Sequence, residues 1–129
     1  MQVVRAGSRG TTREPAPLAA DWLRGPHQDD ALDVALVHFA PGAATPPHVH
    51  HGGQVLVVTA GMGFVEVGGV VTDLMPGDIV VTPAGEEHVH GAAAGGSFSH
   101  LSVTTGRNEM LVGGVDYPGS PAATDEPGA

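Results

Sequence analysis

Glycine and proline interrupt this chain so often that long helices are excluded. Twenty glycines and eleven prolines occur among 129 residues, and both residue types disfavour the interior of a helix. The segments between them are short and rich in valine, which is typical of β-strands. We therefore expect an all-β fold of about seven to nine short strands, arranged as a sandwich or a small barrel of two antiparallel sheets. The predicted strands cover residues 32–39, 54–59, 63–67, 70–74, 78–82, 87–91, 97–104 and 110–112.

The length of the chain fits one domain, which we divide into three parts. Residues 1–30 are predicted to form an N-terminal arm with a short turn or edge strand around Trp22, the one tryptophan. Residues 31–112 hold the predicted strands and form the barrel. Residues 113–129 are rich in glycine, proline and acidic residues, and we expect a flexible tail.

Charge and composition exclude several classes of function. Five arginines and no lysine stand against fourteen acidic residues, and the net charge is −9. Such a surface repels nucleic acids and anionic membranes, so we expect neither as a partner. The absence of cysteine excludes disulfides and zinc-thiolate sites. No apolar run is long enough to span a membrane and no signal peptide is visible, so we expect a cytoplasmic protein.

Histidines occur in two pairs that suit a metal site. His48 and His50 are separated by one residue, as are His88 and His90. Alternate residues of a strand share a face, so each pair presents two imidazoles on one side. Metal ions bind neutral imidazoles that converge from different strands. One such pair is weak evidence, and two in a small all-β domain are stronger.

The spacing around these pairs resembles the two signature motifs of the cupin superfamily. Here the motif G-x5-H-x-H-x3-E-x6-G runs from Gly42 to Gly61, with Gln54 at the glutamate position. The motif G-x5-P-x-G-x2-H runs from Gly77 to His88, and its proline and glycines are all present. The resemblance covers roughly residues 32–104 and implies a cupin jelly-roll barrel, the double-stranded β-helix of two antiparallel sheets.

The chain also resembles the small single-domain cupins that include bacterial manganese hydroxynitrile lyases. The shared segments are Ala20-Asp21-Trp22, residues 42–61 with Gln54, residues 85–92, and Ser99-His100-Leu101-Ser102. This resemblance implies a general base at His100, whose ordinary pKa of about 6.5 suits proton transfer at neutral pH. It implies a divalent metal, Mn²⁺ first, with Fe²⁺, Ni²⁺ and Zn²⁺ as alternatives. The implied metal ligands are His48, His50, Gln54 and His88.

The remaining site residues rest on this resemblance and on strand alternation, which leaves open which face of the strand 97–104 lines the cavity. His90 shares the face of His88, and we expect it at the pocket, beside the metal or the substrate. We expect His38 on the surface, and His27 and His51 in solvated loops. The predicted substrate pocket is lined by Ala35, Val37, Leu56, Phe98, Ser102 and Thr104.

The segment 54–59 is apolar on both of its faces, so we expect the strand to be covered on both sides, within the sandwich or at a subunit contact. Since cupins commonly pair through edge strands, a homodimer or larger homo-oligomer is expected.

Three functions fit these predictions. The first is a metal-dependent lyase acting on a small organic substrate, with the metal as Lewis acid and a histidine as base, as in hydroxynitrile lyases. The second is a cupin dioxygenase that uses the same metal site. The third is a non-catalytic cupin that binds a small molecule. Metal content and turnover discriminate among them.

Overall fold

The computed structural model describes residues 11–13, 18–25, 27 and 29–111. The predictions for the first ten residues and for the tail 113–129 lie outside this part of the chain. Within the described residues no helix is long and apolar enough to cross a membrane.

The described residues contain strands and no helix, which confirms the all-β prediction. The strands are β1 (Thr11–Arg13), β2 (Leu18–Arg24), β3 (Asp33–Phe39), β4 (His48–His50), β5 (Gln54–Gly61), β6 (Gly63–Val67), β7 (Val70–Leu74), β8 (Ile79–Thr82), β9 (Val89–Ala92), β10 (Phe98–Thr104) and β11 (Asn108–Met110).

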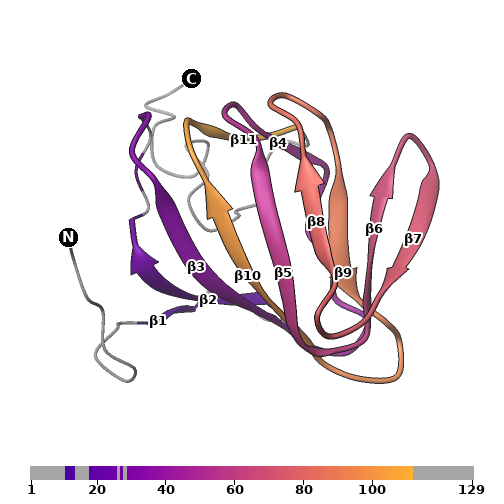
Figure 1. Cartoon of the computed structure of the whole chain (residues 1–129). Helices are drawn as coiled ribbons and strands as arrows, with labels where there is room; N and C mark the ends of the chain where they lie inside the picture. The colour runs from indigo at the N-terminus through magenta and orange to yellow at the C-terminus, as the bar shows by residue number, and fades with distance from the viewer. Residues whose placement is uncertain (1–10, 14–17, 26, 28, 112–129) are drawn as a thin grey trace.

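Two antiparallel layers form the barrel. One is a six-stranded sheet in the order β1-β2-β3-β10-β5-β8, whose strands β3, β10, β5 and β8 lie side by side (Figure 1). The other contains the sheet β7-β6-β9 and the pair β11-β4. Bridges join β4 and the segment before it to the region of β9: Ala44 pairs with Gly91, and His48 pairs with His88. This arrangement is a jelly roll, as the motifs predicted.

Alternation along the strands separates an inner face from an outer face. In β3 and β10 every second residue is buried, beginning with the first. The buried apolar cluster fills the inner face, where it shields the chain from water. Its members are Leu18, Ala20, Ala35, Val37, Phe39, Ala43, Leu56, Val58, Leu74, Ala92 and Phe98.

Motif glycines occupy turns that other residues would strain. Gly42, Gly61, Gly77 and Gly85 all have positive φ, a conformation that costs little for glycine alone. At Gly61 the fit is also steric, because a Cβ atom would lie 2.0 Å from the carbonyl oxygen of Ser97. The motif therefore marks the places where the chain turns between strands.

Several predicted elements differ in extent from the observed ones, and three of them show why. The region around Trp22 is a full strand, β2, because it pairs with β3 along most of its length. Strand β9 begins at Val89, two residues later than predicted. The last strand lies at 108–110 rather than 110–112, because β11 pairs with the short β4 and its register places Asn108 opposite His50.

Candidate metal centre

Strand β4 supplies the first two candidate ligands. Its three residues alternate, so His48 and His50 point inward while Val49 between them is half-buried. Both histidines are almost completely buried, with 0% and 1% of their surface exposed. The predicted shared face of this pair is therefore present.

The backbone brings His88 against His48. Two hydrogen bonds join them: the His48 amide donates to the His88 carbonyl at 3.1 Å, and the His88 amide donates back at 3.0 Å. The turn of the second motif is held to the same strand, because the Gly85 amide donates to the carbonyl of His50. The two motifs, 40 residues apart between these histidines, are thus fixed to each other by main-chain contacts.

One ring nitrogen from each of four buried histidines lies within 4.8 Å of the others, and these residues are His48, His50, His88 and His90. His90 therefore belongs to the same cluster as the three predicted histidine ligands. Such a spacing allows the four nitrogens to surround a single ion, since metal–nitrogen bonds measure about 2.0–2.2 Å. The structure thus contains a four-histidine site suited to a divalent metal.

The outer nitrogens of three ligands are fixed by oxygen acceptors. Nδ1 of His48 lies 2.8 Å from the Pro46 carbonyl, and Nδ1 of His88 lies 2.9 Å from the Glu86 carbonyl. Nδ1 of His50 lies 2.6 Å from Oδ1 of Asn108. An oxygen acceptor requires that Nδ1 carry the proton, so Nε2 of each ring keeps its lone pair for a metal.

Gln54 adds an oxygen next to the histidine cluster. Its side chain is 3% exposed, and Oε1 lies 3.2 Å from Nε2 of His88. Because Nδ1 of His88 holds the proton, two lone pairs face each other across this gap, and a shared cation would relieve their repulsion. Two ligands at a right angle around an ion, each about 2.1 Å from it, lie about 3 Å apart. The residues present therefore fit a metal ion.

Burial keeps the site neutral. Removal from water lowers the pKa of His88 and, to about 4, that of His50. The pKa values of His48 and His90 fall well below the ordinary range, first through burial and then through the neighbouring imidazoles. Neutral imidazole is the form that binds metal, so the histidines need no deprotonation at pH 7.

His100 extends the cluster towards β10. Its Nε2 lies 3.0 Å from Nδ1 of His90, and its ring packs against Phe39 and Phe98. The pairing of β10 with β5 shifts register between Ser99 and His100, a local irregularity of the kind that re-aims side chains at functional sites. Burial lowers the pKa of His100 to about 3, so the expectation of an ordinary pKa near 6.5 is wrong.

The six predicted pocket residues all lie on the inner face. Ala35, Val37, Leu56 and Phe98 belong to the apolar cluster. Ser102 and Thr104 are also buried, with 8% and 5% exposed. The side of β10 that faces the interior, which alternation left open, is therefore the side of His100.

The other three histidines lie outside this cluster. His38 is partly exposed, as predicted, and contacts Ser99 at 2.8 Å and Asp21 at 3.1 Å. His51 is exposed and contacts Glu109 at 2.8 Å.

The prediction of a solvated loop at His27 is incomplete. Its ring and amide both bond the buried carboxylate of Asp33, which anchors the segment between β2 and β3.

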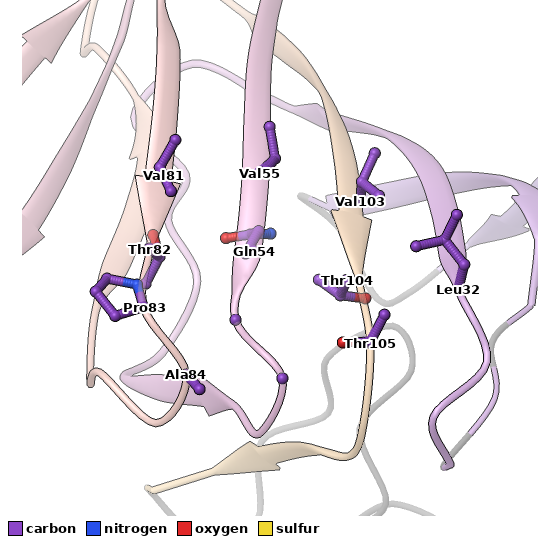
Figure 2. Close-up of a pocket in the computed structure, with 12 residues that line it drawn as sticks. Leu32, Gln54, Val55, Val81, Thr82, Pro83, Ala84, Val103, Thr104 and Thr105 are labelled. Carbon is purple, nitrogen blue, oxygen red and sulfur yellow. The ribbon is translucent and has the colours of Figure 1, made fainter.

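A groove lies along β5, β8 and β10 of the six-stranded sheet, and its lining includes the buried residues Gln54, Thr82 and Thr104. Its volume is about 280 Å³, and Figure 2 shows Leu32, Val55, Val81 and Val103 along it. Val55 and Val81 are 38% and 72% exposed. The outer side of β5 is therefore open within one chain, so the sandwich covers segment 54–59 on its inner face alone. Coverage of the outer face at a subunit contact stays a prediction.

Comparison with known proteins identifies the family. The family model "Cupin domain" matches residues 35–104, the region that holds all the clustered histidines. The chain belongs to the cupin family. Cupins of known structure share its fold over nearly the whole length: a cupin-like protein from Thermotoga maritima is 31% identical, with a TM-score of 0.67 and coverage of 98% of this chain and 99% of the other.

Two further relatives of this cupin carry names of enzymes. The (R)-mandelonitrile lyase of Granulicella tundricola is 41% identical over 113 residues, which cover 80% of this chain and 83% of the relative. The polyketide cyclase RemF from Streptomyces resistomycificus superimposes with a TM-score of 0.70 at 21% identity. The match covers 98% of this chain and 94% of the RemF chain. The second likeness concerns the fold alone.

Asn108 was not among the predicted site residues of this cupin. It is 2% exposed, and its contact with His50 spans 58 positions of sequence. The sequence shows Asn108 as a polar residue next to a short predicted strand. Its contact with His50 depends on how β11 pairs with β4. Sequence pattern alone does not specify that pairing.

Proposed function

We propose that this cupin is a metal-dependent lyase that cleaves or forms the carbon–carbon bond of a small cyanohydrin. The contact that carries this proposal is the one between His100 and His90, because it places a neutral imidazole next to the four-histidine site. The 41% identity to a protein named (R)-mandelonitrile lyase supports the same class of substrate. Mn²⁺ is the proposed ion, held by His48, His50, His88 and Gln54.

A divalent ion at this site would act as a Lewis acid towards a substrate oxygen. The protein contributes the base. His100 is neutral at pH 7, so its ring can accept a proton from the cyanohydrin hydroxyl, whose acidity a bound metal ion would raise. As the carbonyl forms, the carbon–carbon bond breaks and its electron pair leaves with cyanide. The protonated His100 then returns its proton to cyanide, which restores the base and releases hydrogen cyanide.

The walls around the base favour an uncharged substrate. Ala35, Val37 and Phe98 are buried side chains on the inner face, and they supply only apolar surface. A charged molecule would lose its hydration there without a partner. A small neutral compound with one polar group for the metal site suits these surroundings better.

The nitrogen-rich cluster also favours a second candidate, an oxygen-dependent reaction with iron. Four histidines bring no negative charge to the ion, and imidazole ligands suit iron as well as manganese. Oxygen consumption with phenolic or diketone substrates tests this candidate.

The principal experiment compares the parent protein with His100→Ala, both loaded with Mn²⁺ and supplied with mandelonitrile. A general base contributes about 10²–10⁴-fold, so the variant should lose activity by that factor while its manganese content, measured by atomic absorption, stays at the parent value. His38→Ala, at a partly exposed histidine on the outer face, is the matched control and should keep parent activity. Unchanged turnover in His100→Ala would refute the assigned base.

A further inference from the structure

The amide of Gln54 has two ends that differ in chemistry but hardly in shape. Only the carbonyl oxygen, Oε1, has a lone pair for a metal, whereas the amide nitrogen carries two protons. A glutamine ligand therefore works in one of its two orientations. A glutamate has two equivalent oxygens and meets no such requirement.

Ser102 meets the nitrogen end of this amide. Nε2 of Gln54 donates a hydrogen bond to Oγ of Ser102 at 2.8 Å. On the opposite side of the amide, Oε1 lies 3.2 Å from Nε2 of His88. Gln54 and Ser102 are 3% and 8% exposed, so bulk water does not offer the amide alternative partners.

The sheet fixes where the hydroxyl lies. In the pairing of β5 with β10, Gln54 stands opposite Thr104, and Ser102 stands opposite Leu56. Ser102 is thus the diagonal neighbour of Gln54 on the inner face, within reach of a long side chain. From this position it meets the amide from the side of β10.

We propose that Ser102 is a positioning residue that holds the Gln54 amide with its oxygen towards the metal. This inference rests on the proposed coordination by Gln54 and adds a role for Ser102 beyond that of a pocket wall. Without the hydroxyl, the amide nitrogen loses the acceptor that the structure describes for it, and the flipped amide would aim two protons at the ion. Ser102 therefore matters because residue 54 is a glutamine, and its effect should disappear with a glutamate there.

A double-mutant cycle tests this dependence. The parent, Ser102→Ala, Gln54→Glu and the double variant are titrated with Mn²⁺ alone, and free Mn²⁺ is measured by electron paramagnetic resonance. Partners that orient a ligand contribute about 10–100-fold to metal affinity. We expect Ser102→Ala to weaken binding by about that factor when residue 54 is glutamine, and by less than about threefold when it is glutamate.

Two further variants separate orientation from stability. Ser102→Thr keeps the hydroxyl and should bind Mn²⁺ within about threefold of the parent. Ser99→Ala removes the neighbouring serine of β10, which contacts His38 on the outer face, and should also match the parent. The midpoint of thermal unfolding is measured for each metal-free variant, so that a loss of fold is recognised.

Four results would overturn the inference. Equal weakening by Ser102→Ala in both backgrounds would indicate a general structural role. No weakening in the glutamine background would show that the amide needs no orientation. Parent-like Mn²⁺ affinity in Gln54→Ala would assign the fourth ligand to His90 instead, and with it refute the role of Ser102. A parent that binds no Mn²⁺ would refute the proposed function as well.

Discussion

The eight histidines of this chain fall into an inner group and an outer group that differ in their partners. Each of the three outer histidines contacts a carboxylate: His27 contacts Asp33, His38 contacts Asp21, and His51 contacts Glu109. The inner five contact carbonyl, amide and imidazole groups in the described structure. The inner histidines are His48, His50, His88, His90 and His100.

This difference shows how one residue type serves two purposes. Burial is the largest cause acting on the pKa of each inner ring, and it favours the neutral form. Neutral rings leave their lone pairs for a metal and leave its charge uncompensated. The position of each histidine relative to the sheet, rather than its sequence neighbours, therefore decides its chemistry.

Acid should affect the inner group most strongly. Burial places the pKa values of these histidines below 6.5, with His50 at about 4 and His100 at about 3. Their contribution to the free energy of unfolding is complete above pH 6.5. This contribution is lost as the pH falls from 6.5 towards those pKa values. In this window, each histidine that stays neutral in the folded protein lowers the free energy of unfolding by about 1.4 kcal/mol for every unit by which the pH falls. The free energy of unfolding of the metal-free protein, measured with urea, should therefore fall by several kcal/mol between pH 7 and pH 5. Constant stability over this range would contradict the burial of neutral rings.

Removing a single inner ligand should nearly abolish metal binding. One of the few metal donors is deleted in each of the variants His48→Ala, His50→Ala and His88→Ala. Residues that only orient a ligand change metal affinity by up to roughly 100-fold, so each of these variants should lose more Mn²⁺ affinity than that. Isothermal titration measures the loss. His38→Ala removes an outer histidine and should bind Mn²⁺ like the parent. Full metal retention in all three inner variants would show that the ligands are assigned wrongly.

A smaller effect is expected from the support of one ligand. Asn108 accepts from Nδ1 of His50 at 2.6 Å, which fixes the proton on the outer nitrogen. Asn108→Ala should weaken Mn²⁺ binding by about 10–100-fold. The adjacent Glu109→Ala breaks an exposed contact with His51 and serves as the control. Equal affinities in the two variants would mean that Asn108 does not orient the ligand.

The outer pairs should contribute least. His38 and Asp21 are 42% and 24% exposed at their side chains, so water and salt screen their attraction. Asp21→Asn should change the free energy of unfolding by about 1 kcal/mol or less. A loss of more than about 2 kcal/mol in urea titrations would show that this pair has a larger structural role than its exposure indicates.

Much of the fold and part of the site could be predicted from sequence because they depend on local rules. The alternation of residues along β10 predicts one shared face for Phe98, His100, Ser102 and Thr104, and the structure confirms this. The motif glycines predicted turns, and all four have positive φ. Strand period and backbone sterics act within a few residues, so they are visible in the order of amino acids.

Local rules of this kind do not predict contacts between strands that are far apart in the sequence. Alternation could not choose which face of β10 is buried, and it did not find Asn108 or the hydrogen bond between Gln54 and Ser102. The expectation of an ordinary pKa for His100 was also wrong, because burial lowers that pKa to about 3. The sequence by itself determined an all-β cupin whose motifs carry two pairs of histidines. The tertiary structure decided which histidines lose water and which side chains orient the ligands, because desolvation and side-chain contacts depend on packing between segments far apart in the chain.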